Sequence, residues 1–377
     1  MPEAFEYLAP DYYPNFSCKM GGCRTCCCDG WTVSLSMQDY FQLLGVECKK
    51  NLRSRLDVAM RPAMNPTPEH YAEIARRFDG DCPMRMDDGR CAIHAQLGAA
   101  HLPAICRLYP RALRGEGDLE CSCACSCERV VEMLLNHPEP LRFIPLQLND
   151  APPQAQGSTV FRERFQGEQA LRLKLIGLVQ DRAYPLPERL GRLGLAMARL
   201  EAGQGTDFDS ACLSAPPTPG ADIDAALRAV EALVDMLDER SAGLRQFGEA
   251  ARQYFGQNDA ASKRYAQARA HFEAAFPCWE SGFANLLVNH MFFTRFPYSN
   301  GEETLYREHV ALCALYALMR VLAIGHTAQN DGSEALVDVL AALFRLADHS
   351  SFHHYAALML EELHFAAPEL LAALTAL

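Results

Sequence analysis

Cysteines are concentrated at one end of this chain, and their spacing limits what the chain can fold into. Of the 16 cysteines in 377 residues, thirteen precede residue 128, and the remaining chain holds only Cys212, Cys278 and Cys313. A thiolate is a soft ligand, and several thiolates placed close together attract zinc, copper(I) or iron–sulfur clusters. The spacing therefore predicts a metal site, with disulfides or reduced, buried thiols as the alternatives.

The rest of the sequence favours a reduced, intracellular setting for these cysteines. The first residues are acidic and contain no apolar run, so no signal peptide is expected, and adjacent cysteines such as Cys26, Cys27 and Cys28 pair poorly in disulfides. No segment reaches the roughly 18 apolar residues of a membrane span, and the nearest, 310–324, carries Arg320. The net charge of −12 gives no overall basic field for nucleic acid. We expect a cytoplasmic protein that binds neither membranes nor nucleic acid.

The chain divides by composition into two predicted domains. Residues 1–135 form a cysteine-rich part with turn residues and short elements: Thr32–Leu35 alternates like a strand, and Ser36 with Asp39 resembles the start of a helix. Residues 136–160 contain several prolines and are predicted to be an irregular connection. Residues 136–377 as a whole are assigned to the second domain.

From about residue 160 onward, apolar residues recur at helical spacing, and a proline-rich stretch at 214–220 is predicted to be a linker between two helices. The helical patterns cover 171–179, 222–256, 259–275, 280–294, 304–325, 334–347 and 352–363. The predicted fold class is therefore mainly α: an irregular cysteine-rich metal-binding N-terminal domain with short strands, followed by an all-α helical bundle.

The candidate metal ligands form four groups along the chain: Cys18–Cys28, Cys82 with Cys91, Cys106, and Cys121–Cys127. A turn at Asp87-Asp88-Gly89 is predicted to form a hairpin between Cys82 and Cys91. The tract Cys121–Cys127 would place four sulfurs on one face if it were extended, and its alternative interpretation is a scavenging tract like that of a metallothionein. A zinc ribbon requires two paired C-x2-C knuckles, and only Cys23-x2-Cys26 fits that spacing.

In their order along the chain, these motifs resemble the zinc- or iron-chelating cysteine-cluster family, and within it the flagellin lysine N-methylases. The resemblance rests on Cys18-x4-Cys23-x3-Cys27-Cys28-x-Gly30-Trp31, Cys82-Pro83, Cys91, Cys106-x2-Tyr109-Pro110-Arg111 and Ser126-Cys127, with 285–297 as an apolar helix that ends before a proline. The metal ligands that it implies are Cys18, Cys23, Cys27, Cys28, Cys82, Cys91, Cys106 and Cys127. Further cysteines depart from the pattern, and each could replace a neighbour as a ligand: Cys26, Cys48, Cys121, Cys123 and Cys125.

The resemblance implies methyl transfer from S-adenosylmethionine to lysine side chains of unassembled flagellin, with a [4Fe–4S] cluster in the enzyme and zinc as the alternative metal. Eight thiolates exceed the four that one such cluster needs, so additional structural cysteines or a zinc ion are both open. Neither a radical-SAM Cys-x3-Cys-x2-Cys triad nor a strand–GxGxxG–helix unit is present. Any cofactor site would thus be of an unfamiliar kind.

Candidate cofactor-binding residues lie beside the cysteines, and the sequence identifies no catalytic residue. Tyr109 and Arg111 follow Cys106, and Arg111 could bind a cofactor carboxylate bidentately or form a structural ion pair. Trp31 is a further pocket candidate or a core residue, and His94 and His101 are ligands or surface histidines. Asn285, Asn289 and His290 share one apolar helix, where they either reach a ligand or bond between helices. The alternative function is a non-enzymatic cysteine-cluster protein that binds or carries metal.

Overall fold

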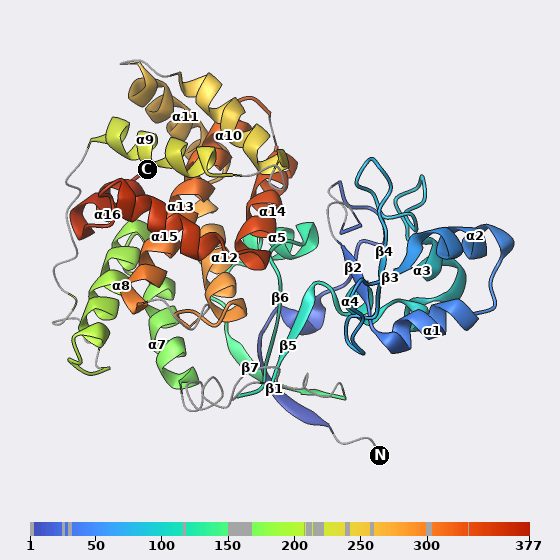
Figure 1. Cartoon of the computed structure of the whole chain (residues 1–377). Helices are drawn as coiled ribbons and strands as arrows, with labels where there is room; N and C mark the ends of the chain where they lie inside the picture. Colours follow the sequence, from blue (N-terminus) through green and yellow to red (C-terminus); the bar gives the residue numbers. More distant parts are fainter. Residues whose placement is uncertain are drawn as a thin grey trace. The chain divides into compact units, whose positions relative to one another are not determined.

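A computed structural model describes the chain at residues 4–24, 27–28, 32–115, 118–149, 168–206, 208, 213, 222–237, 242–256, 260–298, 304–330 and 332–377. The chain forms two compact units (Figure 1): unit 1 is Met1–Phe16 with Leu113–Leu377, and unit 2 is Ser17–Ala112. The division predicted at residue 135 therefore differs from the one between these units. Residues 113–135 belong to unit 1 because a strand and a helix within them pack on its helices.

Unit 2 contains a small antiparallel sheet of three strands in the order β2 (Val33–Leu35), β4 (Ala72–Ile74) and β3 (Met60–Pro62). Its helices are α1 (Met37–Gly45), α2 (Lys50–Ala59), α3 (Ala92–Leu97) and α4 (Ala104–Leu108), with a short 3-10 helix at Ala99–His101. The predicted strand is confirmed as β2. The predicted helix start is confirmed too, because Ser36 and Asp39 form a capping box at α1.

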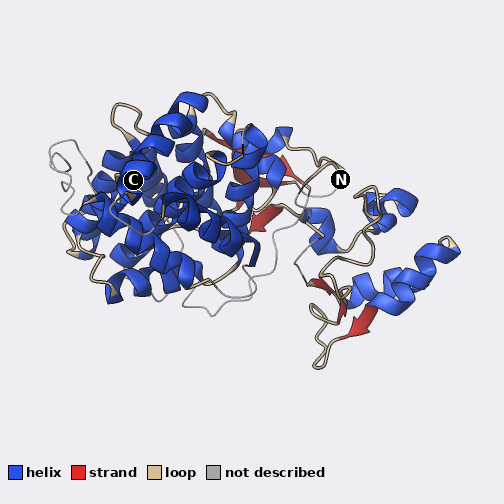
Figure 2. Cartoon of the chain, turned by 90° about the horizontal axis from the view of Figure 1, so that it is seen from above, coloured by secondary structure: helices blue, strands red, loops and turns tan. Residues whose placement is uncertain are grey.

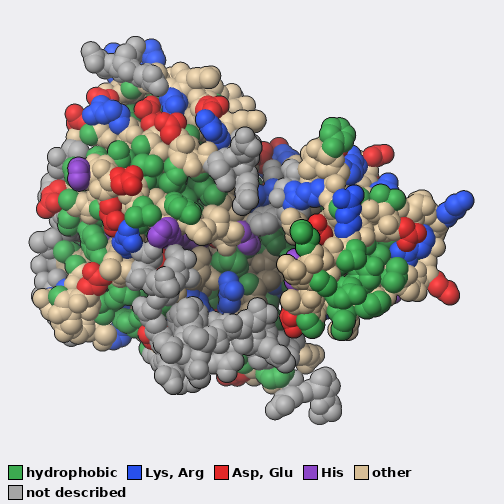
Figure 3. Space-filling model, viewed as in Figure 1, with side chains coloured by type: hydrophobic (Ala, Val, Ile, Leu, Met, Phe, Trp, Pro, Cys, Tyr) green, Lys and Arg blue, Asp and Glu red, His purple; other side chains and the backbone are tan. Residues whose placement is uncertain are grey.

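An apolar surface covers α1 on the face of unit 2 shown in Figure 3. Met37, Phe41 and Leu44 are exposed there, and the ring of Phe41 packs against Tyr40 and Tyr71. The buried side of the same helix contributes Leu43 to the core of the unit.

Unit 1 has a four-stranded sheet in the order β5 (Arg111–Arg114), β6 (Glu120–Cys123), β1 (Phe5–Pro10) and β7 (Phe143–Leu148). Strand β1 runs parallel to β6 and antiparallel to β7, with Phe5 opposite Leu148. Figure 2 shows these strands at one edge of a unit that consists mostly of helices. The prediction of an irregular connection over 136–160 is wrong at β7, because the edge of β1 pairs with that segment.

The helices of unit 1 confirm the mainly α fold class. They are α5 (Glu128–Leu135), α7 (Gln169–Gln180), α8 (Leu186–Glu201), α9 (Ile223–Asp235), α10 (Ala242–Phe255), α11 (Ala261–Ala275), α12 (Trp279–Phe293), α13 (Leu305–Thr327), α14 (Ser333–His349), α15 (Phe352–Glu362) and α16 (Pro368–Thr375). Helices α12 and α13 are buried on almost every side, as expected for helices that are apolar all round. The predicted linker at 214–220 lies outside the described residues.

Helix α13 is long and apolar enough to cross a membrane, unlike the shorter stretch noted in the sequence. However, 94% of its most apolar window is buried inside unit 1. Its length therefore serves to contact many neighbours, among them α8, α10, α14, α15 and α16.

Candidate functional site

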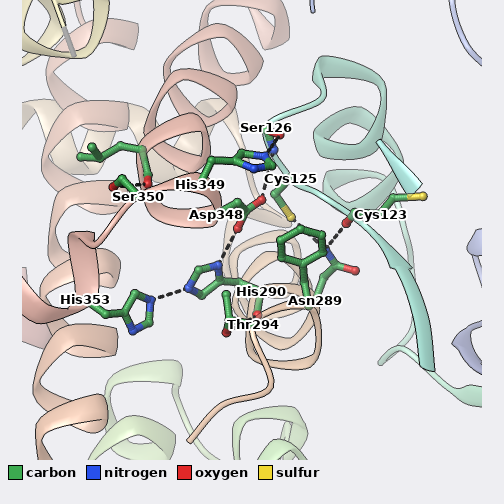
Figure 4. A network of polar contacts seen from close by, with 12 residues as sticks. Cys123, Cys125, Ser126, Asn289, His290, Thr294, Asp348, His349, Ser350 and His353 are labelled. Atoms are coloured by element: carbon green, nitrogen blue, oxygen red, sulfur yellow. Dashed lines mark hydrogen bonds and ion pairs between the residues drawn. The ribbon is translucent and has the colours of Figure 1, made fainter. Parts of the chain in front are cut away.

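The largest group of buried polar side chains in unit 1 surrounds Asn289 and His290 on α12 (Figure 4). Both side chains are fully buried. A polar group removed from water requires hydrogen-bond partners, and each of these residues has them on helices or strands distant in sequence. The network joins the end of β6 to α12, α13, α14 and α15.

Asn289 connects the cysteine tract to the N-terminal segment. Its Nδ2 group donates to the carbonyl oxygen of Cys123 at 2.9 Å and to Sγ of Cys125 at 3.0 Å. Its Oδ1 atom accepts a 2.6 Å hydrogen bond from the hydroxyl of Tyr12, which in turn accepts one from the amide of Cys123. One amide side chain thus holds three chain segments together.

His290 belongs to a line of four hydrogen-bonded side chains, in the order Asp348, His290, His353 and Glu308, which we call the imidazole row. The Nδ1 atom of His290 is 2.7 Å from Oδ1 of Asp348, and its Nε2 atom is 2.7 Å from Nε2 of His353. The Nδ1 atom of His353 is 3.1 Å from Oε2 of Glu308. All four side chains are at most 5% exposed. The row therefore lies in a water-poor environment, where charges interact strongly.

The Asp348 end of the imidazole row meets the turn that follows β6. The amide of Ser126 donates to Oδ2 of Asp348 at 3.3 Å, and the Ser126 hydroxyl is 2.8 Å from Nε2 of His349. Ser126 is buried, whereas His349 is exposed at the end of α14. At this end, Ser126 and His349 link the row to the surface.

Burial determines the electrostatics of these groups. It raises the pKa values of the Tyr12 phenol and the Cys125 thiol well above their usual range, so both hold their protons at neutral pH. It also lowers the pKa values of His290 and His349, and the negative charge of Asp348 opposes both of these decreases. Neutral rings are therefore favoured at both histidines.

A second buried polar group lies between the sheet and the helices of unit 1. Arg172 on α7 binds both carboxylate oxygens of Glu120 on β6, at 2.6 and 2.8 Å, and Arg295 lies 3.8 Å from the same carboxylate. Arg172 also donates to the carbonyl oxygen of Phe292 at the end of α12. This ion pair fixes the end of α12 beside β6, and thereby the position of Asn289.

A third polar pair faces a small cavity between α8, α13 and α16. Sγ of Cys313 is 3.5 Å from Nε2 of His309, and both side chains are buried. Burial lowers the pKa of His309 to about 4 and raises that of Cys313. The cavity has a volume of about 50 Å³, which suits water rather than a substrate.

In unit 2, thiols from three segments of the sequence gather around one small core. Cys82 is part of that core, and Cys28, Cys91 and Cys106 pack against it. The amide of Cys82 donates to the carbonyl oxygen of Cys28 at 2.9 Å. The predicted hairpin is confirmed by the bridge between Arg85 and Cys91, with Gly89 at φ +80° in its turn.

Glycines bring the first cysteine group against this hairpin. A Cβ atom on Gly89 would lie only 2.5 Å from the carbonyl oxygen of Gly21, and one on Gly21 would meet the backbone of Arg90. The loop that carries Cys18 and Cys23 therefore approaches the Cys82–Cys91 hairpin backbone to backbone, as only glycines permit.

The donor atoms suit a soft metal, although their present arrangement is not that of a ligand set. Burial raises the pKa of Cys106 to about 12, and the nearby thiols of Cys91 and Cys82 add to this effect. Within the described ranges, no group of three or more His, Cys, Asp or Glu side chains is placed to hold a metal ion. None of the described cysteines forms a disulfide.

The structure distributes the eight predicted ligands between the two units. Cys127 lies in unit 1 as the N-cap of α5, and the other seven lie in unit 2. The extended arrangement considered for Cys121–Cys127 is wrong, because β6 ends at Cys123 and a turn precedes α5. Cys121, Cys123 and Cys125 are buried in the core of unit 1.

Other predicted site residues have separate positions. Tyr109 ends α4 and Arg111 begins β5, and both are half-buried. Trp31 and Cys26 lie outside the described residues. His101 contacts the carbonyl oxygen of Leu97 at 2.8 Å. Asn285 donates to the carbonyl oxygen of His137, which is the structural alternative considered for it.

Sequence reasoning identified Asn289 and His290 but missed their partners. Tyr12, Glu308, Asp348 and His353 come from four segments, and no spacing rule relates them. The available signal was a polar residue within an apolar helical pattern, as at Glu308 beside His309 in the first turn of α13.

Comparisons with known proteins agree on one family. Residues 172–373 match the model of the FliB lysine N-methylase C-terminal domain, and this range includes Asn289 and the whole imidazole row. The lysine-N-methylase of Salmonella choleraesuis is 29% identical over 139 residues, which are 34% of this chain and 32% of that protein. The lysine-N-methylase of Salmonella typhimurium is 28% identical over 139 residues, which are again 34% of this chain and 32% of that protein.

A shorter relative extends the comparison. The flagellar biosynthetic protein FliU of Salmonella muenchen is 27% identical over 139 residues, which are 34% of this chain and 77% of that protein. The match thus spans about a third of the length of the two lysine-N-methylases. No solved structure matches the chain.

Proposed function

Because the chain belongs to the FliB lysine N-methylase family, we propose that it transfers methyl groups from S-adenosylmethionine to lysine side chains of flagellin. The observation that carries this proposal is the family match over 172–373, more than half of the chain. The names of the relatives, lysine-N-methylase and flagellar biosynthetic protein, support the reaction and the flagellar substrate. The enzyme would act in the cytoplasm on unassembled flagellin.

The reaction makes definite demands on a site. The amine lone pair of lysine attacks the sulfonium methyl carbon, the S–CH3 bond breaks, and the ammonium form must first lose a proton. The lysine amine has a reference pKa of about 10.4, so a site must favour its neutral form and exclude water. A buried network of proton-holding groups such as the one around α12 supplies suitable chemistry.

For the cofactors, we propose that Cys28, Cys82, Cys91 and Cys106 hold a [4Fe–4S] cluster, with zinc as the alternative. These four thiols share the core of unit 2. When bound, the metal would tie the loops of unit 2 together and stabilise them. Arg111, with Tyr109 beside it, is proposed to bind the carboxylate of S-adenosylmethionine, since a guanidinium pairs bidentately with carboxylates.

The test uses the full-length chain purified without oxygen. It is mixed with S-adenosylmethionine and unassembled flagellin from the same organism, and flagellin is analysed by intact-mass spectrometry and peptide mapping. We expect mass increases of one or more methyl groups on lysine. Arg111→Ala should weaken methyl transfer while metal content stays constant, and Arg90→Ala, which removes an exposed arginine paired with Asp88, serves as its control.

The gathering of thiols in unit 2 also suits a protein that binds or carries metal without catalysis. A metal-loaded protein that leaves the mass of flagellin unchanged would favour this second function over the first. Visible absorption together with iron and sulfide analysis separates a cluster from zinc, which is colourless.

A further inference from the structure

The imidazole row forms three hydrogen bonds end to end, through side chains from four helices. Figure 4 shows Asp348 from α14, His290 from α12 and His353 from α15. The fourth residue, Glu308, comes from α13. The three separations are 2.7, 2.7 and 3.1 Å, all within hydrogen-bond range. The middle contact joins the Nε2 atoms of the two histidines. This pairing is unusual because the Nδ1 atom of each imidazole is also hydrogen-bonded, in both cases to a carboxylate.

A count of hydrogens shows what this geometry requires. Each of the three contacts needs one hydrogen between its two heavy atoms. A neutral imidazole carries one hydrogen and an ionised carboxylate carries none, so neutral rings with two carboxylates supply only two. The row must therefore hold a third proton, or two lone pairs would face each other at 2.7 Å between the Nε2 atoms.

We propose that the imidazole row is a buried proton relay that holds three protons and transfers one proton equivalent between Glu308 and Asp348. In the first arrangement Glu308 is protonated, the hydrogens are on Nε2 of His353 and Nδ1 of His290, and Asp348 is ionised. If each hydrogen moves across its own bond, Glu308 becomes ionised and Asp348 protonated. The net charge of the four groups is −1 in both arrangements, and neither contains an imidazolium ion.

The surroundings suit both arrangements. Glu308 lies in the first turn of α13, where a helix N-terminus favours negative charge. Asp348 accepts the amide hydrogen of Ser126 at 3.3 Å. Burial lowers the pKa of His290, consistent with a His290 ring that stays neutral. The other titratable groups beside this end include the Tyr12 phenol, the Cys125 thiol and His349.

This inference rests on the proposed function and deepens it. Methyl transfer requires the lysine ammonium to release one proton within a site that excludes water. The relay would take up that proton at one end and release another at the opposite end, and at the Asp348 end Ser126 and the exposed His349 lead toward solvent. No ion has to cross the core. These four residues would act through the proton and without touching the methyl group.

Two conservative variants lock the relay in opposite arrangements. In Glu308→Gln, the amide NH2 group donates to Nδ1 of His353, which places the remaining hydrogens on Nε2 of His353 and Nδ1 of His290. In Asp348→Asn, the amide oxygen stays with the Ser126 amide and the NH2 group faces His290, so the hydrogens move to Nε2 of His290 and Nδ1 of His353. Both variants keep all three hydrogen bonds but cannot pass a proton.

The first measurement does not depend on activity. In the full-length protein labelled with 15N-histidine, nitrogen chemical shifts report which ring atoms carry hydrogen, and His290→Asn and His353→Asn provide the assignments. We expect opposite tautomers in Glu308→Gln and Asp348→Asn, averaged shifts in the wild type, and coupling between the two Nε2 atoms. The same tautomers in both variants would overturn the relay, as would a metal ion bound between the rings.

The second measurement uses unassembled flagellin and S-adenosylmethionine. Glu308→Gln should slow single-turnover methylation about 100-fold and abolish its solvent deuterium isotope effect, while Glu361→Gln, at a partly exposed ion pair, should change neither. If the wild type methylates and Glu308→Gln matches it in rate and isotope effect, the relay is wrong and the proposed function stands. If the wild type does not methylate, the proposed function is wrong, and the tautomers alone decide the relay.

Discussion

At the scale of single residues, loss of the Asn289 side chain should remove three buried hydrogen bonds. Asn289→Ala leaves the Cys123 carbonyl and the Tyr12 hydroxyl in the core without this partner. An unsatisfied buried polar group costs about 1–3 kcal/mol, so we expect a clear fall in the free energy of unfolding. Urea denaturation measures it. Asn330→Ala, on an exposed residue at the end of α13, should change little.

The Glu120–Arg172 pair allows a matched comparison between a buried and an exposed ion pair. Glu120→Gln leaves Arg172 and Arg295 without their negative partner in the core, where breaking a pair costs about 3–5 kcal/mol. Glu361→Gln breaks a partly exposed pair with Arg307, worth at most about 1 kcal/mol. Thermal melts of both variants test this, and equal shifts would show that the Glu120 pair is not special.

His309 should make the stability of unit 1 depend on pH. Its pKa is about 4 in the folded chain because of burial, whereas the unfolded value is about 6.5. Between these values the unfolded chain binds the proton and the folded chain does not, so stability falls as pH drops from 6.5 to 4, by up to about 3 kcal/mol.

Denaturation at several pH values tests this dependence. His309→Gln should lose less stability on acidification than the wild type, and a variant of the exposed His271 should follow the wild type. An unchanged slope in His309→Gln would mean that this histidine is protonated in the fold.

Part of the site was predictable from single residues. A polar side chain within an apolar helical pattern, such as Asn289 or His290, must find a partner when the helix is buried. Which partner it finds depends on which helices are neighbours, and hydrophobic spacing carries no information about that. Asp348 and His353 therefore had no signal of their own.

At the scale of elements, the Cys82–Cys91 hairpin depends on a glycine for two reasons. Gly89 has φ +80°, and a Cβ atom there would lie 2.5 Å from the carbonyl oxygen of Gly21. Gly98 has φ +84° and ψ 173° with open space around it, so Gly98→Ala measures the cost of a glycine backbone conformation alone, about 1–3 kcal/mol.

We expect Gly89→Ala to be clearly more destabilising than Gly98→Ala, because a clash with backbone cannot be relieved by a side-chain rotation. Urea denaturation of both variants gives the difference. Gly89→Ala should also separate the Cys18–Cys23 loop from the hairpin, and limited proteolysis near Gly21 would detect this separation. Similar values for the two variants would mean that the close approach of the loops is not needed.

The helical elements were predicted better than the strands. Apolar residues recur with a period of 3.6 residues through α7 and through α9 to α15. These patterns were sufficient to predict the helices. Strand β7 was missed because Pro145 within it, together with the prolines on either side, resembles a linker. A strand at a sheet edge tolerates proline. The tract Cys121–Cys127 alternates like a strand throughout, but α5 requires its N-terminal turn at residues 125–127, and tertiary packing determines where the strand stops.

At the scale of the whole molecule, the two units predict which cysteines matter for metal. Cys106→Ser should remove bound metal and lower the melting temperature of the anaerobic protein, because metal binding contributes directly to folding. Cys278→Ser, at an exposed position in unit 1, should keep full metal content. Elemental analysis with melting curves measures both effects.

Cys127→Ser extends this test to the resemblance with the cysteine-cluster family. If the metal site is confined to unit 2, Cys127→Ser keeps its metal. If the eight family-matched cysteines act together, Cys127→Ser loses its metal. Metal loss in Cys278→Ser as well would mean that the division into units does not determine the site.

In the sequence, unit 2 is inserted into unit 1 between β1 and β6, and it ends within β5. This arrangement has a consequence for synthesis on the ribosome. Strand β1 is made first, but its partners β6 and β7 follow only after residues 17–112. Domains generally fold as units while the chain grows. Unit 2 can therefore complete its core before the strands that pair with β1 have been synthesised. A folded insertion also shortens the effective loop that must close. Strand β1 is thus synthesised well before the strands with which it pairs.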